Sequence, residues 1–444
     1  MNIDFITRPI LESNDKTCII APEGRYTFKQ IYDEYIKARD LIRQEGIKPH
    51  SVVALVADYS AKSIAMFVAL IEIDSILVPI AKSIINKQLY VDVTQTEYYI
   101  DMSENDVPSI RKTGIVADHP MLVDLKQAGD PGLILLSSGT TGTPKAALHN
   151  MAKLLEKFKN PGKTLVTITF LLFDHIGGFN TMMHTLTHGG TIVTLKDRSP
   201  EEVCRLIEKE KVELLPTSPT FLNMILLNKL LDKYDLSSLK IISYGTEPMP
   251  ESTLKALAEK LPNTRLKQTY GLSEVGIMAT KSESSTSLWM KIGGDGFETK
   301  IVDDILYIRA QSAMIGYLNA PSPFDEEGWF CTKDKVEQKD GYIHILGRVT
   351  DLINVGGEKV YPIEIESALL EYPGVLEAHV YAEDNPLTGK SIVADIEVAP
   401  ENNNRDFIKQ LRKFSLGRLE KFKRPVKYNL TTDTLSGERF KKKR

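Results

Sequence analysis

The chain contains 444 residues, of which 42% are hydrophobic and 26% are charged, and its formal net charge is −4. A chain of this length is too long for one compact core, so we expect one large domain and a smaller one. The lack of a basic excess argues against nucleic acid as a partner. Cys18, Cys204 and Cys331 are widely spaced. This argues against a disulfide framework or a cysteine-based zinc site and fits the reducing environment of the cytoplasm.

The sequence gives no membrane or export signal. Residues 1–15 lack the basic-then-apolar pattern of a signal peptide. The most apolar window, residues 63–80, contains Glu72 and Asp74, so we expect no membrane span. The basic tail at 440–444 is expected to be a solvated end of the chain.

The first half of the chain alternates strands and helices. Residues 27–46 predict a helix, because Thr27 and Gln30 match a capping box, apolar residues recur near one face, and Gly46 provides a stop. The next predicted elements form a βαβ unit: a strand at 52–57, a helix over about 60–73 and a strand at 76–80.

The alternation continues to about residue 271. Ser199 and Pro200 suit the N-cap and the first position of a further helix. Because such alternation produces a parallel sheet covered by helices, we expect the α/β fold class. The strands predicted here lie at 133–138, 164–170, 190–195, 212–216, 240–245 and 265–271, with helices after Lys145, between 170 and 190, after Ser199 and between the last two strands.

The alternation of strands and helices ends after about residue 290. The pattern predicts a hairpin at 298–310, a short β segment at 328–348, a helix from Pro362, two strands and an amphipathic helix over about 405–421. We therefore expect a large N-terminal domain of parallel and mixed sheets over residues 1–348. A small mobile α+β domain is expected over 349–444, with a hinge near Thr350.

Residues 137–145, SSGTTGTPK, predict a phosphate-binding loop. Its glycines let backbone N–H groups approach phosphate oxygens, its hydroxyls add donors, and Lys145 adds a positive charge. The usual nucleotide loop, G-x-x-x-x-G-K-[ST], is excluded, because Gly139 and Gly142 are too close together and two residues separate Gly142 from Lys145.

This loop is one of eight motifs that, in their order, resemble the adenylate-forming superfamily of acyl-CoA synthetases, adenylation enzymes and luciferases. The resemblance extends from about residue 20 to the C-terminus. The other seven motifs are FDHIGG (173–178), YGTEPM (244–249), QTYGLSE (268–274), MIGYLN (314–319), GWFCTKD (328–334), GRVTDLINVGGEKVYPIEIE (347–366) and TLSGERF (434–440).

The resemblance implies ATP as a substrate and Mg²⁺ as a cofactor. Lys145 is expected to contact the β- and γ-phosphates. Glu274 and Thr140 are expected to hold Mg²⁺, a hard ion that prefers carboxylate and phosphate oxygens. The residues implied to bind ATP or AMP are Ser137, Ser138, Gly139, Thr140, Thr141, Gly142, Lys145, Gly245, Thr246, Glu247, Pro248, Tyr270, Gly271, Ser273, Asp334 and Arg348.

Within that set, the backbone of residues 245–247 is implied to line one face of the adenine and Tyr270 the other. Asp334, assisted by Arg348, is implied to accept bonds from the ribose hydroxyls. The family usually has a glycine before this aspartate, and the chain has Lys333, so we expect a locally altered backbone there.

The implied reaction joins a carboxylate to the α-phosphate of ATP, expels pyrophosphate, and then passes the acyl group to a thiol. The family places a lysine in a C-terminal S-G-K motif, where this chain has Glu438. Three interpretations follow. Arg439 or Lys441 takes the catalytic role, adenylation runs slowly on Mg²⁺ and Lys145 alone, or the chain is a degenerate acyl- or nucleotide-binding homologue that does not adenylate.

The FDHIGG segment bears on which acid is activated. His175 resembles the histidine of acyl-CoA synthetases, which favours a simple carboxylic acid, whereas Asp174 resembles the aspartate of amino-acid-activating enzymes. The thiol acceptor is coenzyme A or the phosphopantetheine of a carrier protein, with Gly357 and Lys359 expected beside the pantetheine arm. The residues expected to line the acid pocket are Asp174, His175, Gly178, Ser218, Tyr244 and Gly245.

Overall fold

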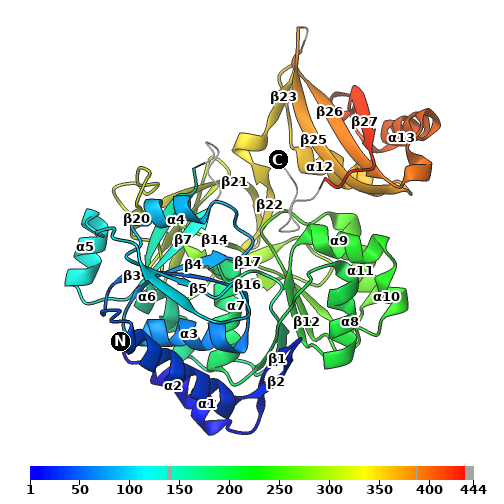
Figure 1. Cartoon of the computed structure of the whole chain (residues 1–444). Coiled ribbons are helices and arrows are strands. Elements are labelled where there is room, and N and C mark those ends of the chain that lie inside the picture. Colours follow the sequence, from blue (N-terminus) through cyan, green and yellow to red (C-terminus); the bar gives the residue numbers. More distant parts are fainter. Residues whose placement is uncertain (138–142, 387, 436–444) are drawn as a thin grey trace.

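The computed structural model describes residues 1–137, 143–386 and 388–435. A large lobe ends with β22 (Tyr342–Arg348), and a small lobe begins with β23 (Ile353–Val355). The 3₁₀ turn Val349–Asp351 joins them, and Figure 1 shows the small lobe standing over one end of the large lobe. Within the described ranges no helix is long and apolar enough to cross a membrane.

Two seven-stranded sheets form the body of the large lobe. The first has the order β13-β12-β11-β9-β10-β1-β2 and is parallel except at its β1–β2 edge. Its strands are β1 Thr17–Ala21, β2 Gly24–Thr27, β9 Val166–Ile168, β10 Thr191–Val193, β11 Leu214–Thr217, β12 Ile241–Tyr244 and β13 Arg265–Gln268.

The second sheet has the order β20-β8-β7-β4-β3-β5-β6, with a parallel centre and antiparallel edges. Its strands are β3 Val52–Ala57, β4 Ile76–Ala81, β5 Tyr98–Asp101, β6 Ser109–Lys112, β7 Gly132–Ser137, β8 Lys145–Asn150 and β20 Gly316–Tyr317. The expected α/β class is therefore confirmed.

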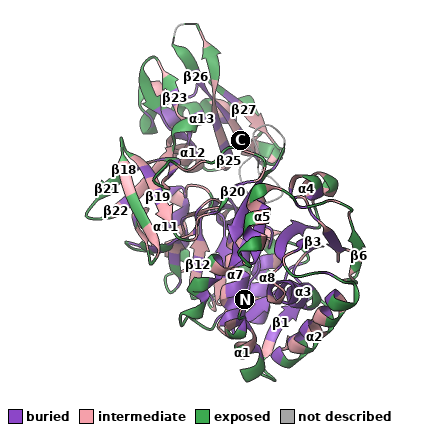
Figure 2. Cartoon of the chain, turned by 90° about the vertical axis from the view of Figure 1, so that its left-hand side faces the viewer, coloured by how far each residue is buried: buried purple, intermediate pink, exposed green. Residues whose placement is uncertain are grey.

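Helices cover both sheets, and the largest core lies among α2, α3 and α7 and the strands that they contact. Helix α3 is buried at almost every position, which explains why its sequence is apolar all round. Buried residues gather on α7 and on strands such as β1 and β3 in Figure 2. The helices of the large lobe are α1 Asp4–Glu12, α2 Phe28–Gln44, α3 Ala61–Glu72, α4 Lys87–Val93, α5 Pro120–Gln127, α6 Met151–Leu155, α7 Ile176–Thr187, α8 Pro200–Glu210, α9 Pro219–Leu227, α10 Leu230–Lys233 and α11 Glu251–Lys260.

The predicted helix starts are confirmed where a side chain caps the backbone. Thr27 and Gln30 form the expected capping box of α2, and the Ser199 hydroxyl accepts from the Glu202 N–H at the start of α8. The helix predicted after Lys145 is present as α6 (Met151–Leu155), but it does not begin until strand β8 (Lys145–Asn150) has ended. Strand β8 pairs with β7 and with β20, so the ladder hydrogen bonds override the helix propensity of its alanines and leucine.

An antiparallel sheet completes the large lobe, and it includes the predicted hairpin and the predicted short β segment. Its order is β16-β17-β22-β21-β19-β18. The remaining strands of this region are β14 Gly271–Leu272, β15 Gly276–Ile277, β16 Ala279–Ser282, β17 Met290–Gly293, β18 Phe297–Val302, β19 Ile305–Ala310 and β21 Phe330–Lys339.

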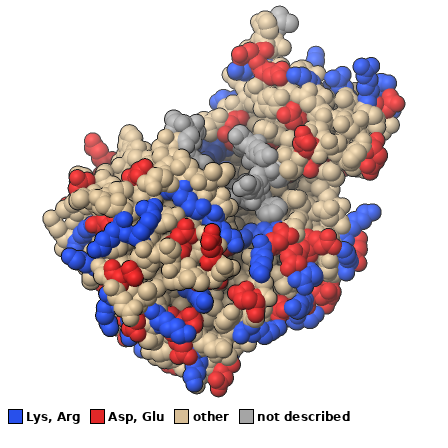
Figure 3. All heavy atoms as spheres, in the orientation of Figure 1, with Lys and Arg blue, Asp and Glu red and all other residues tan. Residues whose placement is uncertain are grey.

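The small lobe has a five-stranded sheet packed against two helices. On the large lobe, the Asn223 side-chain amide of α9 donates to the Leu376 carbonyl of the small lobe at 3.0 Å. Figure 3 shows acidic and basic side chains interspersed over one face of both lobes. The elements of the small lobe are β23, β24 Glu358–Val360, α12 Pro362–Leu370, β25 Val375–Asn385, β26 Gly389–Val398, α13 Arg405–Arg418 and β27 Lys427–Thr431.

Candidate active site

Candidate residues follow the carboxyl ends of β12 and β13 in the first sheet and of β7 in the second. Open α/β sheets bind ligands outside the carboxyl ends of their strands, so these strand ends are the expected place for a site. Ser137 ends β7, Gly245 follows β12, and Thr269 follows β13. The phosphate-loop residues Ser138, Gly139, Thr140, Thr141 and Gly142 lie outside the described residues.

Tyr317, a residue from the MIGYLN motif, contacts both Lys145 and Glu274. The Tyr317 hydroxyl donates to Glu274 Oε1 at 2.5 Å, and Lys145 Nζ lies 5.2 Å from the centre of the Tyr317 ring. Burial, together with the neighbouring carboxylate, raises the pKa of the Tyr317 phenol, so it stays protonated and donates.

The chemistry of Glu274 fits Mg²⁺ held jointly with a nucleotide. In the described ranges no three His, Cys, Asp or Glu residues are grouped so as to hold a metal ion. Mg²⁺ commonly binds through one or two carboxylates together with substrate phosphates, which needs no all-protein cage. A partly buried carboxylate beside a lysine matches that mode.

A second polar cluster joins Tyr270, Asp334 and Arg348. The Tyr270 hydroxyl donates to Asp334 Oδ2 at 2.5 Å, and Arg348 Nε donates to Asp334 Oδ1 at 3.3 Å. Burial raises the pKa of Asp334, and the contacts with Tyr270 and Arg348 oppose that rise. Tyr270 is only 7% exposed, so the structure gives it the task of holding Asp334, and its stacking on adenine stays a prediction.

Lys333, directly before Asp334, has an unusual backbone conformation. Its φ is +60°, in the left-handed region that glycine adopts without strain and a lysine does not. The backbone at Lys333 is therefore locally strained directly before the buried Asp334 carboxylate.

The loop after β12 is also strained. Thr246 has a φ of +74°, which is rare for a β-branched residue. A Cβ at Gly245 would meet Thr269 Oγ1 at 2.5 Å, so only glycine fits between the ends of β12 and β13. Glu247 accepts from the Thr220 N–H at 2.8 Å, which fixes the loop to the start of α9.

The remaining predicted nucleotide residues are packed nearby. A Cβ at Gly271 would meet Ile277 Cδ1 at 2.5 Å, so glycine is needed where β14 pairs with β15. Ser273 and Pro248 are half-buried. The pKa of His149, which is buried on β8, is lowered to about 4 by desolvation, and the backbone of Ser273 partly opposes that shift.

The predicted acid-binding residues Asp174 and His175 directly precede helix α7. His175 is its N-cap, and its Nδ1 accepts from the Gly177 N–H at 3.0 Å, which puts the proton of the neutral ring on Nε2. Asp174 is buried. A Cβ at Gly178 would lie 1.9 Å from the Leu172 carbonyl oxygen, so this glycine allows α7 to pack on the segment that precedes it.

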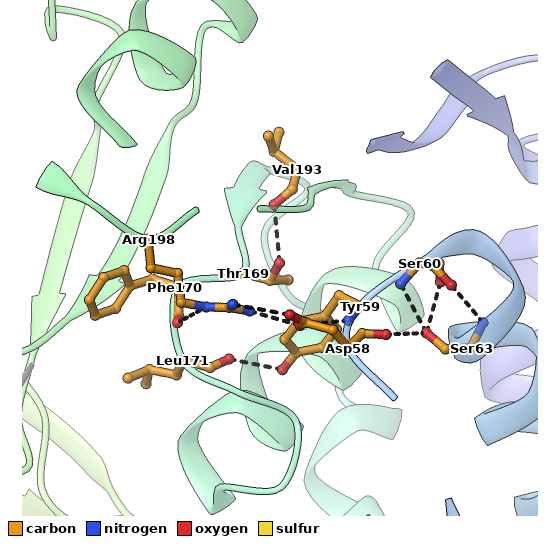
Figure 4. Close-up of polar contacts among 9 residues, drawn as sticks. All are labelled: Asp58, Tyr59, Ser60, Ser63, Thr169, Phe170, Leu171, Val193 and Arg198. Atoms are coloured by element: carbon orange, nitrogen blue, oxygen red, sulfur yellow. Dashed lines mark hydrogen bonds and ion pairs between the residues drawn. The ribbon is translucent and has the colours of Figure 1, made fainter. Parts of the chain in front are cut away.

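The segment that precedes α7 is held in place by an ion pair between Arg198 and Asp58, shown in Figure 4. Arg198 binds Asp58 with both terminal nitrogens, at 2.8 and 3.1 Å, and its Nε donates to the Phe170 carbonyl at 3.1 Å. The Tyr59 hydroxyl donates to the Leu171 carbonyl at 3.0 Å. Because Asp58 follows β3 and Arg198 follows β10, the pair ties the two large sheets to the segment that carries the candidate acid site.

Two other residues predicted to line the acid pocket have structural contacts. The Ser218 hydroxyl accepts from the Phe221 N–H as the N-cap of α9. Tyr244 is 1% exposed and belongs to the core of the first sheet. A pocket role for either residue stays a prediction.

Gly357 and Lys359 lie on the exposed β23–β24 hairpin of the small lobe. Gly357 has a φ of +96°, and apart from its two chain neighbours no described residue lies within 4 Å of the position a Cβ would occupy. Arg439 and Lys441 lie outside the described residues.

A cavity of about 480 Å³ lies at the opposite edge of the first sheet, before β9, β12 and β13, and is lined in part by Lys163, Lys240 and Arg265. It is at the amino ends of the strands, away from the residues assembled above, so the size of a cavity does not identify the site here.

Sequence reasoning missed Tyr317, Asp58 and Arg198. Tyr317 lies inside the quoted motif MIGYLN, so the motif itself could have drawn attention to it. Nothing in the sequence pairs Asp58 with Arg198, because their contact arises only when the two sheets pack together.

The fold and the candidate site define a class of protein. It is a two-lobed α/β protein in which residues predicted to bind a nucleotide follow the carboxyl ends of the sheet strands. The family model of the AMP-binding enzymes matches residues 81–318, and the model of the AMP-binding enzyme C-terminal domain matches residues 364–441. The chain belongs to the AMP-binding enzyme family, which confirms the resemblance to adenylate-forming enzymes.

Among curated proteins, the chain is 30% identical to 4-coumarate-CoA ligase 1 of Narcissus pseudonarcissus, over 59% of this chain and 54% of that protein. It is 27% identical to the mitochondrial medium-chain acyl-CoA ligase ACSF2 of Mus musculus, over 67% of this chain and 53% of that protein. The chain thus spans about half the length of the curated relatives it matches.

Among solved structures, the anthranilate CoA ligase AuaEII in complex with anthranoyl-AMP is similar with a TM-score of 0.82 and 20% identity, covering 99% of this chain and 94% of that one. ATP-bound MatB from Rhodopseudomonas palustris is similar with a TM-score of 0.79 and 19% identity, covering 99% and 96%. These likenesses establish the two-lobed fold.

Proposed function

We propose that the protein is an AMP-forming acid–thiol ligase. The observation that supports this most directly is that Tyr317 contacts both Lys145 and Glu274, while Tyr270, four positions before Glu274, binds Asp334, in a chain of the AMP-binding enzyme family. A lysine and a metal-binding carboxylate suit a triphosphate, and a buried aspartate suits ribose hydroxyls.

The proposed first step joins an acid to ATP. A carboxylate oxygen of the acid bonds to the α-phosphorus, the bond from that phosphorus to the bridging oxygen breaks, and pyrophosphate leaves. Lys145 is proposed to stabilise the charge that develops on the departing pyrophosphate. Mg²⁺, held by Glu274 and Thr140, would neutralise phosphate charge. Asp334 and Arg348 hold the ribose, and His175 orients the acid.

In the second step a thiol sulfur bonds to the acyl carbon and AMP leaves. The acceptor is proposed to be coenzyme A, since the curated relatives are named as CoA ligases, and a carrier protein's phosphopantetheine presents the same arm. Gly357 and Lys359 are proposed to reach the arm after the small lobe turns about the hinge near Thr350. The cytoplasm is the proposed location.

The test is acid-dependent exchange of labelled pyrophosphate into ATP. The panel should contain aromatic acids such as 4-coumarate and anthranilate, medium-chain fatty acids, and amino acids. Mass spectrometry then monitors the formation of a thioester on coenzyme A. Exchange with a simple acid but not with amino acids supports the proposal. Exchange only with amino acids would favour the interpretation in which Asp174 corresponds to the aspartate of amino-acid-activating enzymes.

A second candidate function is nucleotide or acyl binding without adenylation, which Glu438 favours. It predicts saturable ATP binding, no pyrophosphate exchange with any acid, and no thioester from a preformed acyl-adenylate and coenzyme A. The exchange assay and the preformed adenylate together separate the two candidates.

A further inference from the structure

Tyr317 stands between two opposite charges that do not pair with each other. Its hydroxyl donates to Glu274 Oε1 at 2.5 Å, and its ring lies 5.2 Å from Lys145 Nζ. Among the ion pairs within 4 Å that the described residues form, none joins Lys145 to Glu274. The phenol thus binds the carboxylate with its edge and the ammonium with its face.

Strand register explains this placement. Tyr317 of β20 is the cross-strand partner of Ala147 on β8. Side chains on a strand alternate between faces, so Lys145 and Ala147 share a face, and Tyr317 is the diagonal neighbour of Lys145. Tyr317 is 7% exposed, and it packs with Met314 and Ala147, so the ring has little freedom to move.

The same segment fixes the backbone at both charged residues. Asn319 accepts from the Ala146 N–H at 3.0 Å and donates to the Pro144 carbonyl at 2.8 Å, which holds the chain on both sides of Lys145. The Met314 N–H donates to the Glu274 carbonyl at 2.8 Å. Residues 314–319 therefore position the lysine and the glutamate together.

We propose that Tyr317 is a positioning residue that keeps the Lys145 ammonium and the Glu274 carboxylate apart and aimed at the same phosphate group. Without the tyrosine the two charges can approach and neutralise each other, which removes both a phosphate contact and a metal ligand. The inference deepens the proposed function and rests on it, because it assigns a task to a residue of that same site.

The test measures metal binding directly. Mn²⁺ serves as the probe for Mg²⁺, and its binding is measured at equilibrium in the presence of a non-reactive α,β-methylene analogue of ATP. Tyr317→Phe removes only the hydroxyl, and we expect about tenfold weaker Mn²⁺ binding, as is typical when the partner of a metal-ligating carboxylate is lost. Tyr317→Leu also removes the aromatic ring, and we expect a larger loss together with weaker binding of the analogue itself.

Tyr381→Phe is the matched control, because the Tyr381 hydroxyl donates to Asp395 at 3.3 Å in the small lobe. It should leave Mn²⁺ binding unchanged, and the thermal midpoint of Tyr317→Phe should match the wild type. Unchanged Mn²⁺ binding in Tyr317→Phe, with pyrophosphate exchange in the wild type, overturns this inference alone. A wild type that neither binds Mn²⁺ with the analogue nor catalyses exchange overturns the proposed function as well.

Discussion

Lys333 is a single residue whose backbone strain can be measured. A left-handed conformation costs a residue with a side chain about 1 to 2 kcal/mol. Glycine removes that strain but gives the unfolded chain more freedom, which offsets roughly 0.5 to 1 kcal/mol. Because φ at Lys333 is +60°, we expect Lys333→Gly to raise the free energy of unfolding by about 0.5 kcal/mol, measured by urea denaturation.

Lys281→Gly is the control for this prediction. Lys281 is also an exposed lysine in the antiparallel sheet, on β16, and its φ is not positive. Glycine there should lower the free energy of unfolding by roughly 0.5 to 1 kcal/mol. If both variants lose stability equally, then Lys333 carries no strain.

At the scale of elements, the Asp58–Arg198 pair should affect the KM for the acid and leave the KM for ATP nearly unchanged. Both side chains are largely buried, at 13% and 16% exposed, and Arg198 also holds the Phe170 carbonyl. Asp58→Asn keeps the shape and removes the charge, so the segment before α7 loses one of its anchors. We expect the KM for the acid to rise about tenfold, because small misplacements of a binding group reduce catalysis steeply, while the KM for ATP stays within about twofold. Steady-state exchange kinetics measure both.

The surface pair Glu202–Arg205 supplies a matched control. It is also bidentate, but it joins residues of α8 that are 29% and 45% exposed. Glu202→Gln should change neither KM, because exposed pairs of this kind contribute little. Equal changes in the KM for the acid and for ATP in Asp58→Asn would show a general loss of structure and would contradict a specific effect on the acid.

The elements that sequence predicted well are those specified by neighbouring residues. The capping box at Thr27 and Gln30 and the Pro200 start of α8 depend on contacts within four positions, and both are present. Strand β8 was missed because its conformation depends on pairing with β7, which precedes it, and with β20, about 170 residues later. The Asp58–Arg198 pair was missed for the same reason, since it forms only across the packed sheets.

At the scale of the molecule, the sequence predicted a large and a small domain and a boundary between residues 348 and 349. In the structure the large lobe's last strand ends at Arg348, and the small lobe's first strand begins at Ile353. The sequence could not predict how the lobes meet, because the Asn223–Leu376 hydrogen bond depends on their relative position. Rotation about Thr350 stays a prediction, since a hinge needs only to tolerate a change in its dihedral angles.

At the same scale, we propose that the charge near the C-terminus decides whether the protein can adenylate. Glu438 stands where the family has a lysine, and Arg439 and Lys441 follow it, all outside the described residues. A unit charge about 4 Å from another contributes roughly 4 kcal/mol at an effective dielectric of 20, which is about three decades in rate. We therefore expect a nearby cation to replace the missing lysine, and Arg439 and Lys441 are the two cations within three positions of Glu438 on its C-terminal side.

We expect Arg439→Ala or Lys441→Ala to lower the rate of pyrophosphate exchange by about 100-fold or more, and Glu438→Lys to change it by less than about threefold. The reason is that a second cation adds little where one already faces the departing pyrophosphate. Lys443→Ala, in the same basic tail, is the control and should leave the rate unchanged. A rise of decades in Glu438→Lys, with no loss in either alanine variant, would mean that the catalytic cation is missing from this chain.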